Sequence, residues 1–351
     1  MKTLTPSRHE IMLPSYIIVG EGVIKRVGEV ISRFEVKGKA LVLIGEKVEG
    51  IVSDHISISL RERSISFDSV VIKEASSEEI AKAIEVAKEE NPKVILGVGG
   101  GSVIDVAKLT ANEVNANFVS VPTAASHDGI ASPVVSIKGS PSKFVKVPSA
   151  IVADIDVISK APHRLIASGC GDIIAKLTAV RDWELAHKLK GEYYGDYAAS
   201  LARMSALMIV RHAEAIAKGS GSGIRLLVEA LISCGVAMCI AGSSRPCSGS
   251  EHLFSHALDL VAPKPALHGE QCGVGTIMMS YLHKMKWYFI RKVLKTVGAP
   301  TTAKELGVHD YYIVKALTIA HKIRDRYTIL GESGLSEDAA ERLAKATGVI
   351  D

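Results

Sequence analysis

The sequence is poor in aromatic side chains and in clustered basic ones, and this excludes one broad class of function. Aromatic residues make up 5% of the 351 residues, and the formal net charge is only +4 at pH 7. Lys and Arg form no long runs and do not interleave with aromatic residues, as surfaces that bind single-stranded nucleic acid do. We therefore expect no nucleic-acid partner.

Paired cysteines and membrane-length apolar runs are also missing. The five cysteines are an odd number without a C-x-x-C pair, so neither a disulfide framework nor a thiolate zinc site is indicated. The longest apolar run, at 230–242, is too short to cross a bilayer and is expected to be a buried core helix, without a membrane span. Residues 1–10 are polar and lack a signal-peptide core. These absences predict a cytoplasmic protein.

A glycine turn is the most informative feature that is present. Residues 94–98 are apolar, three glycines follow at 99–101, and apolar residues then recur at helical spacing from Ser102. This order predicts a buried parallel strand, a turn and a helix start. Glycines let a ligand approach the backbone, and the unpaired N–H groups of a helix start attract phosphate. The fit to G-x-G-x-x-[G/A] is imperfect because Ser102 replaces the last small residue, and a turn without a ligand is the alternative.

Strand and helix patterns alternate through the first half of the chain, and helical periodicity dominates the second. This predicts a Rossmann-like α/β domain over 1–158, with helices covering a parallel sheet, and an all-helical domain over 159–351. The predicted helices are 21–34 and 76–90, a hairpin joins 134–137 to 144–147, and the predicted strands are 11–18, 39–44, 66–73, 93–98, 117–122 and 151–155.

The segment 122–133 follows a predicted strand and is rich in small hydroxyl and turn-forming residues. Ligands of parallel sheets bind at the carboxyl ends of the strands, where this segment and the glycine turn both lie. Asp128, beside His127, is a candidate for binding a substrate hydroxyl. A solvated loop is the alternative interpretation.

The second half contains residues of the types that bind zinc. Asp172 lies near the start of a helix predicted from Gly169 to about His187, where a carboxylate also suits the helix dipole. His252 and His256 share one helix face, and His268 begins another helix. The ligands of a catalytic zinc ion are either Asp172, His252 and His268, or the pair His252 and His256, and spacing alone does not separate these sets. A nucleotide domain with an open metal site favours hydride transfer at a carbonyl.

These motifs together resemble those of a known superfamily. The run from Gly97 to Lys108, the Gly171-Asp172 pair and the two histidine segments are similar to those of the polyol and iron-containing alcohol dehydrogenases and dehydroquinate synthase. The segments 122–132 and 248–256 are most similar to the glycerol-1-phosphate dehydrogenase family. The likeness covers nearly the whole chain and implies a dehydroquinate synthase-like fold.

The resemblance implies reversible reduction of dihydroxyacetone phosphate to sn-glycerol 1-phosphate, the backbone of archaeal ether lipids. The implied cofactors are NAD or NADP and one zinc ion per subunit, with Asp172, His252 and His268 as the metal ligands. Asp128, Asp172 and His256 would contact the substrate and act in catalysis. The residues implied to line the dinucleotide are Gly99, Gly100, Gly101, Ser102, Val103, Thr123, Ala124, Ala125, Ser126 and Ser132.

Several points stay open at the level of the sequence. The turn 45–47 has no acid directly at the strand end, which leaves NAD and NADP as alternatives. A helix start near Ser248 to Ser250 is one source of donors for the substrate phosphate. The proton reaches the substrate through water or His256. Alternative functions are a glycerol dehydrogenase, a dehydroquinate-synthase-like lyase and a nucleotide-binding scaffold without activity. We also expect a homo-oligomer, a dimer or larger.

Overall fold

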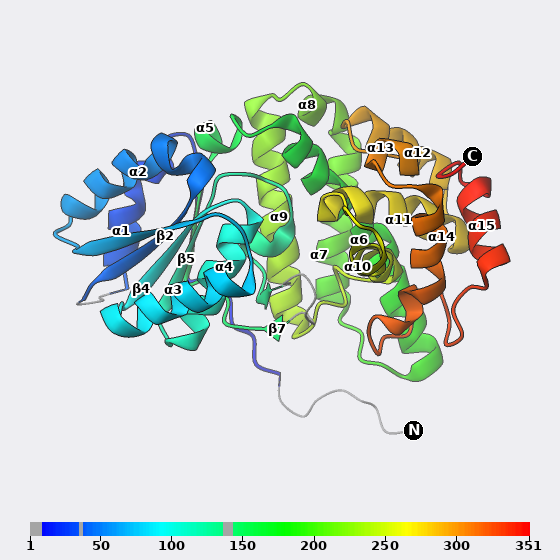
Figure 1. The fold of residues 1–351 in the computed structure, drawn as a ribbon, viewed down its shortest axis with the longest axis horizontal. Helices are drawn as coiled ribbons and strands as arrows, with labels where there is room; N and C mark the ends of the chain where they lie inside the picture. Colours follow the sequence, from blue (N-terminus) through cyan, green and yellow to red (C-terminus); the bar gives the residue numbers. More distant parts are fainter. Residues whose placement is uncertain (1–8, 35–37, 136–142) are drawn as a thin grey trace. The chain divides into compact units, whose positions relative to one another are not determined.

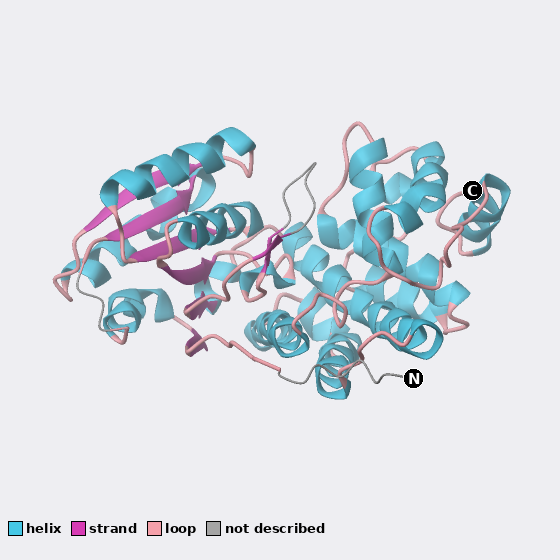
Figure 2. Ribbon diagram, turned by 90° about the horizontal axis from the view of Figure 1, so that it is seen from below, coloured by secondary structure: helices cyan, strands magenta, loops and turns pink. Residues whose placement is uncertain are grey.

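The computed structural model describes residues 9–34, 38–135 and 143–351, and the chain forms two compact units. One unit spans Met12–Pro162, and the other spans His163–Asp351 with the described residues of Met1–Ile11. The first unit contains the strands, whereas the described residues of the second are helices and loops (Figure 2). The predicted fold class, a parallel-sheet domain followed by a helical one, is confirmed.

The first unit is built on a six-stranded parallel sheet with the strand order β1-β8-β5-β4-β2-β3. Continuous apolar runs form the central strands, as expected for strands buried on both faces. A short antiparallel pair joins β6 (Val134–Val135) to β7 (Lys143–Phe144), and the turn predicted between them lies outside the described residues. The sheet strands are β1 (Tyr16–Gly20), β2 (Ala40–Gly45), β3 (Phe67–Ile72), β4 (Val94–Gly99), β5 (Asn117–Pro122) and β8 (Ala150–Asp154).

Helices cover both faces of this sheet (Figure 1). Val42 and Ile44 of β2 belong to the core under one pair of helices, and Leu41 and Leu43 belong to the core under the other pair. This alternation is the period of two that a strand imposes on its side chains. The first face carries η1 (Val23–Arg26), α1 (Val27–Ser32) and α2 (Glu46–Arg61), the second carries α3 (Ser77–Glu90) and α4 (Gly101–Glu113), and the short elements are η2 (Asp128–Ile130) and α5 (Ile155–Ile158).

The sequence reading missed helix α2 and began the first strand too early. Helix α2 is rich in Ile, Val and Ser, which have only moderate helix propensity, so its local signal is weak. Burial of Val52, Ile56 and Leu60 against the sheet stabilises it. Strand β1 begins only at Tyr16, where its pairing with Ala150 of β8 begins.

The second unit is a helical bundle around the long helix α6. Helix α9 is long and apolar enough to cross a membrane by length and composition, but 67% of its most apolar window is buried, as in a core helix. The helices are α6 (His163–Lys190), α7 (Asp196–Arg211), α8 (Ala213–Ala217), α9 (Gly221–Ala241), α10 (Ser250–Val261), α11 (His268–Leu282), α12 (Trp287–Thr296), α13 (Ala303–Leu306), α14 (Asp310–Ile319), η3 (Ala320–Lys322) and α15 (Glu337–Ala346).

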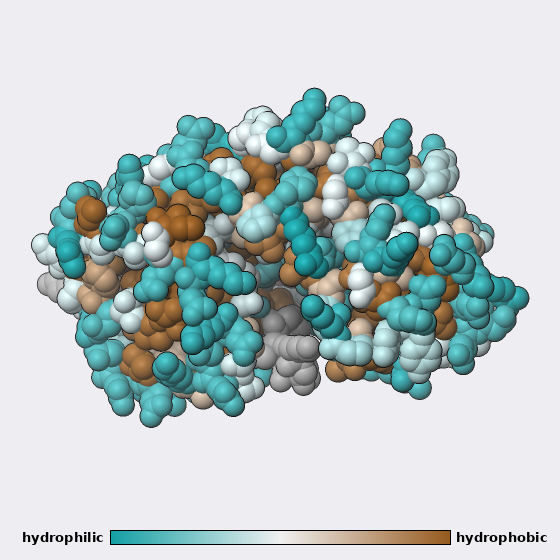
Figure 3. All heavy atoms as spheres, turned by 45° about the horizontal axis from the view of Figure 1, so that its top comes forward, coloured by the Kyte–Doolittle hydropathy of each residue, from teal (hydrophilic) through white to brown (hydrophobic). Residues whose placement is uncertain are grey.

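Exposed apolar side chains are scattered among polar ones. On the face drawn in Figure 3, hydrophilic side chains separate the hydrophobic patches from one another. Tyr197, Met204 and Leu207 of α7 are among the exposed large hydrophobic residues. Exposed apolar residues of this kind are common on folded proteins and do not by themselves mark a binding site.

Candidate active site

Close helix crossings bring the predicted zinc ligands together in the helical unit. A Cβ atom added at Gly171 of α6 would overlap the carbonyl oxygen of Gly269 in α11, and one added at Gly269 would overlap that of Ser168. The backbones of the two helices therefore meet where only glycine fits. Asp172 follows one of these glycines and His268 precedes the other, so the crossing places both residues at the same point.

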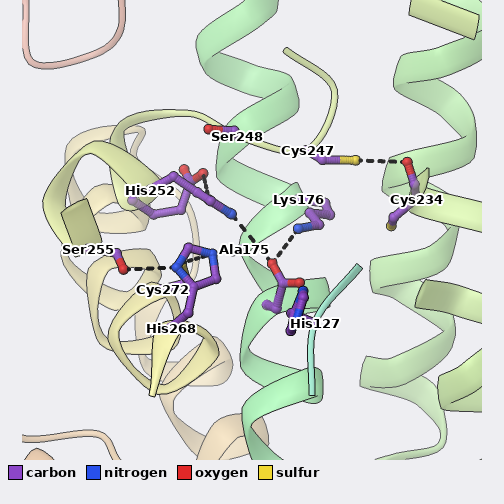
Figure 4. Close-up of polar contacts among 12 residues, drawn as sticks. His127, Ala175, Lys176, Cys234, Cys247, Ser248, His252, Ser255, His268 and Cys272 are labelled. Atoms are coloured by element: carbon purple, nitrogen blue, oxygen red, sulfur yellow. Dashed lines mark hydrogen bonds and ion pairs between the residues drawn. The ribbon is translucent and has the colours of Figure 1, made fainter. Parts of the chain in front are cut away.

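Asp172, His252 and His268 form one cluster, in which Asp172 and His252 are buried and His268 is half-buried. Figure 4 shows the two histidines of this cluster. His252 Nε2 lies 3.4 Å from Asp172 Oδ1, and the ring centroids of His252 and His268 are 5.0 Å apart. Cys272, one turn after His268 on α11, joins them with its sulfur 3.5 Å from His268 Nε2. Potential ligand atoms of His252, His268 and Cys272 all lie within 4.8 Å of one another.

Asp172 lies in the interior of its helix, contrary to the sequence interpretation. Helix α6 begins at His163, not near Gly169, because the chain from 163 to 168 continues the same helix. A carboxylate in the helix interior can neither cap the N-terminus nor pair with its dipole, since both effects are confined to the first turn. The alternative role that the sequence allowed for Asp172 is thereby removed.

Neighbouring side chains fix the orientation of both histidines. His252 Nδ1 donates to Glu251 Oε1 at 2.8 Å, which leaves Nε2 toward Asp172. Glu251 is itself held by Thr178 Oγ1 at 2.7 Å and by the backbone N–H of Gly249 at 2.6 Å. Histidines that bind metals commonly have such a carboxylate on the second ring nitrogen. His268 Nδ1 lies 3.3 Å from Ser255 Oγ.

Charges in the cluster are strongly coupled. Burial alone raises the pKa of Asp172, but the charge of Lys176 and the hydrogen bond from His252 hold that pKa well below its ordinary value. Burial lowers the pKa of His252, yet Cys272 and Asp172 together raise it well above its ordinary value. The pKa of Cys272 is about 7, because the two histidines outweigh the effect of its burial.

The donor set fits a zinc ion. A carboxylate and two imidazoles are common ligands of catalytic zinc, and a tetrahedral ion bound by three protein groups keeps one position open. Asp172 and Cys272 raise the pKa of both imidazoles, and the same negative potential favours a divalent cation beside them. Lys176 contacts Asp172 Oδ1 at 2.5 Å and is fully buried.

His256 lies beside this cluster but is not one of the residues whose possible ligand atoms all lie within 4.8 Å of one another. Its ring centroid is 5.7 Å from that of His268, and its Nε2 accepts a hydrogen bond from Arg324 at 3.0 Å. Burial and the positive charges of His268 and Arg324 hold the pKa of His256 well below its ordinary value. Among the described residues, the group of possible ligand atoms within 4.8 Å of one another contains His252, His268 and Cys272, and includes neither His256 nor Asp172.

The start of helix α10 does not offer the free phosphate donors that the sequence suggested. Its N-cap is Gly249, not Ser248 or Ser250, and this residue has no side chain with which to cap the helix. The backbone N–H of Gly249 donates to Glu251, while the N–H and hydroxyl of Ser250 both donate to Asp182 Oδ2 at 2.6 Å. Among the described residues, these carboxylates occupy the backbone N–H groups at this helix start, which are therefore not free for a phosphate, whereas the hydroxyl of Ser248 has no hydrogen-bond partner.

The glycine turn lies in the sheet unit, between β4 and α4. Gly100 is the N-cap of α4, and a Cβ atom added there would meet no atom of the described residues within 4 Å. At Gly101 an added Cβ would overlap the ring of His127, which packs on the turn. The open backbone at Gly100 and the helix start behind it fit a dinucleotide phosphate.

The segment after β5 is held against this turn. The N–H of Thr123 donates to the carbonyl of Gly99 at 3.0 Å, because β4 and β5 are adjacent strands. The buried Nζ of Lys108 donates to the carbonyls of Gly129 at 2.8 Å and Val134 at 3.0 Å. The predicted dinucleotide residues of both segments therefore lie at one edge of the sheet, although Ala125 and Ser132 are almost fully buried there. Asp128 begins the short helix η2 in the same segment.

Sequence reasoning missed several polar residues around the cluster. Lys176, Glu251 and Cys272 are buried in contact with the predicted ligands, and Arg324 and Arg326 lie close to His256. Lys176 and Cys272 each follow a predicted ligand by four residues on the same helix, a spacing that could have revealed both. The two arginines come from a distant loop and have no such local signal.

Comparison with known proteins agrees with this architecture. Residues 18–162 match the family described as iron-containing alcohol dehydrogenase. Glycerol-1-phosphate dehydrogenases of Thermococcus sibiricus and Staphylothermus marinus are 51% and 52% identical, covering 97% and 99% of this chain and 99% and 100% of their own. The crystal structure of a probable glycerol dehydrogenase from Sinorhizobium meliloti has a TM-score of 0.80 at 21% identity, covering 97% of this chain and 98% of its own.

The parallel sheet with its glycine turn, followed by a helical unit with buried zinc-type donors, defines the iron-containing alcohol dehydrogenase class of oxidoreductases. Within that class, the chain belongs to the NAD(P)-dependent glycerol-1-phosphate dehydrogenase family.

Proposed function

We propose that this protein catalyses the reversible, zinc-dependent reduction of dihydroxyacetone phosphate to sn-glycerol 1-phosphate with NADH or NADPH. The product would serve as the backbone of ether lipids, made in the cytoplasm. The names of relatives at 51–52% identity support the choice of substrate. The single observation that carries the proposal is the cluster of Asp172, His252 and His268.

Asp172, His252 and His268 would hold the zinc ion, which when bound supplies a Lewis acid for the carbonyl oxygen of the substrate. Glu251 keeps the proton of His252 on Nδ1 and so leaves Nε2 free to bind metal. Lys176 keeps Asp172 ionised, and burial keeps competing water away from these donors.

The reduction places a hydride on the central carbon and a proton on its oxygen. The nicotinamide cofactor is the source of the hydride, and the open backbone at Gly100 would bind its pyrophosphate. Nε2 of His256 accepts from Arg324, and its Nδ1 lies 3.9 Å from Asp259 Oδ2. The proton would reach the substrate oxygen from this Nδ1–H or through water.

Two other reactions remain to be separated by experiment. A glycerol dehydrogenase would act on unphosphorylated glycerol with the same metal and nucleotide. A dehydroquinate-synthase-like lyase would show no net loss of nicotinamide absorbance. Assays of NADH and NADPH oxidation with dihydroxyacetone phosphate and with dihydroxyacetone, with and without a chelator, distinguish all three.

The decisive variants are Asp172→Ala, His252→Ala and His268→Ala. Each is expected to lose bound zinc and to lower kcat/KM for dihydroxyacetone phosphate by at least about a hundredfold, as for removal of a metal Lewis acid. His55→Ala, at an exposed position on α2, serves as the matched control and should keep both. Full zinc content and activity in all three variants would show that the site is wrongly assigned.

A further inference from the structure

Three arginines, Arg245, Arg324 and Arg326, lie beside the candidate active site. They differ in whether a carboxylate pairs with the guanidinium. Arg245 is 5% exposed and forms a bidentate pair with Glu192, and its Nη1 donates to the carbonyl of Tyr327 at 2.9 Å. Arg324 and Arg326 follow helix η3 in a loop of the same unit. The charge of Arg245 is thus already balanced by a carboxylate.

Arg326 has only neutral partners in the described part of the chain. Its guanidinium donates to the carbonyl of Ser248 and, at 2.8 Å, to the hydroxyl of Ser244. Burial, together with the charges of Arg245 and Arg324, lowers its pKa to about 9. Arg326 is half-buried, and a partly desolvated cation whose hydrogen-bond partners are neutral favours an anionic ligand.

Two nearby carboxylates have other hydrogen-bond partners. Glu251 accepts from Thr178 and His252, and Asp182 accepts from Ser250, His283 and the backbone N–H of Ile329. Neither of these two carboxylates forms an ion pair with Arg326 in the described part of the chain.

An unsatisfied hydroxyl lies at the same place. Ser248 is 6% exposed, and its buried Oγ has no hydrogen-bond partner among the described residues. The carbonyl of this residue accepts from Arg326, so the guanidinium contacts the residue that carries the hydroxyl. Buried hydroxyls are rarely left without a partner, and this one can donate to an anion that also meets the arginine.

Arg324 and Arg326 also lie on the side of the candidate active site that is formed by His256. Arg324 Nη2 donates to His256 Nε2 at 3.0 Å, and the ring of His256 lies beside that of His268. The charges of both Arg324 and Arg326 act on His256. A ligand that contacts both the zinc-type cluster and these arginines would carry an anionic group in addition to the oxygen that faces the cluster.

We propose that Arg324, Arg326 and the hydroxyl of Ser248 bind the phosphate group of the substrate and select the phosphorylated triose over the unphosphorylated one. This inference rests on the proposed function and identifies its specificity determinants. Arginine suits the task because its planar guanidinium can make two hydrogen bonds to a phosphate.

The test compares two substrates in the zinc-loaded enzyme. For Arg324→Gln, Arg326→Lys and Ser248→Ala, kcat/KM is measured with dihydroxyacetone phosphate and with dihydroxyacetone. The ratio of the two values should fall by about ten- to a hundredfold for each arginine variant and by less for the serine variant, as for a lost hydrogen bond to a charged group. Arg342→Gln, at an exposed surface position paired with Asp338, should keep the wild-type ratio.

Binding of inorganic phosphate, measured by calorimetry, provides an independent readout. Wild-type enzyme should bind phosphate and the arginine variants should bind it at least about tenfold more weakly, with zinc content unchanged. An unchanged substrate ratio, or equal losses on both substrates, would overturn the proposal. If the wild type reduces no triose phosphate, the proposed function fails, and calorimetry still decides whether these three residues form an anion site.

Discussion

A histidine that binds a metal must carry its proton on one ring nitrogen and leave the other unprotonated. Glu251 fixes this arrangement for His252 by accepting a hydrogen bond from Nδ1. The carboxylate is fully buried and accepts from His252 Nδ1. We expect Glu251→Gln to keep the shape of the side chain but to weaken zinc binding by about ten- to a hundredfold. Competition with a chromogenic chelator measures this, using the exposed Glu49→Gln on α2 as the control. Equal zinc affinity in the two variants would contradict the role of Glu251.

Cys272 tests whether the zinc site is open or closed. Its sulfur lies close enough to the two histidines to act as a ligand. A fourth protein ligand would close the tetrahedral position that a catalytic zinc keeps for its substrate, so we expect Cys272 not to bind the ion. Cys272→Ala should therefore retain one zinc per subunit.

Cobalt substitution gives a direct check on this point. Cobalt bound through Asp172, His252 and His268 should show no thiolate charge-transfer band in the near ultraviolet. Such a band, lost in Cys272→Ala, would place the sulfur in the coordination shell instead.

At the scale of elements, the crossing of α6 and α11 positions the cluster. A side chain at Gly269 has no room, because an added Cβ would overlap the carbonyl of Ser168. Gly269→Ala must force the helices apart, which we expect to lower the free energy of unfolding by about 1–3 kcal/mol and to reduce bound zinc. Denaturant titration and metal analysis measure both effects.

Gly221→Ala is the matched control for that substitution. Gly221 begins helix α9, and an added Cβ would meet no described atom within 4 Å. Its stability and zinc content should match the wild type. A similar outcome for Gly269→Ala would show that the close crossing is not required.

The glycine turn before α4 allows a contrasting prediction. Because the position of an added Cβ at Gly100 is open, Gly100→Ala should change the free energy of unfolding by less than about 1 kcal/mol. It should nevertheless raise the KM for NADH at least about tenfold, since the methyl group would fill the space of the pyrophosphate. Gly50→Ala on α2, where an added Cβ also meets no described atom, should leave this KM unchanged. An unaltered KM in Gly100→Ala would move the dinucleotide away from this turn.

At the scale of the whole molecule, zinc binding and stability are linked. An ion that binds only the folded chain stabilises it by about 4 kcal/mol at a free concentration a thousandfold above its Kd. We therefore expect a chelator to lower Tm by several degrees and zinc to restore it. The Asp172→Ala variant should show a much smaller response. Unfolding curves that coincide with and without chelator would indicate that zinc does not bind the native fold.

Much of the fold could be predicted from the amino-acid sequence alone. Continuous apolar runs such as 40–45 and 94–99 predicted strands buried on both faces, and the glycines at 99–101 predicted the turn. Helix α2 was missed because its apolar residues carry a weak local helix signal, and packing against the sheet decides its conformation. Local patterns report which faces are buried, but not the neighbours that bury them.

The sequence by itself determined the order of the sheet strands, the glycine turn, and the identities of Asp172, His252 and His268 as candidate ligands. Only the tertiary structure decided that Asp172 lies inside α6, that carboxylates occupy the start of α10, and that Arg324 and Arg326 lie near His256. The reason is physical. Hydrogen bonds and forces between buried charges act over a few ångströms in space, and helix crossings bring together residues that no periodicity in the chain connects.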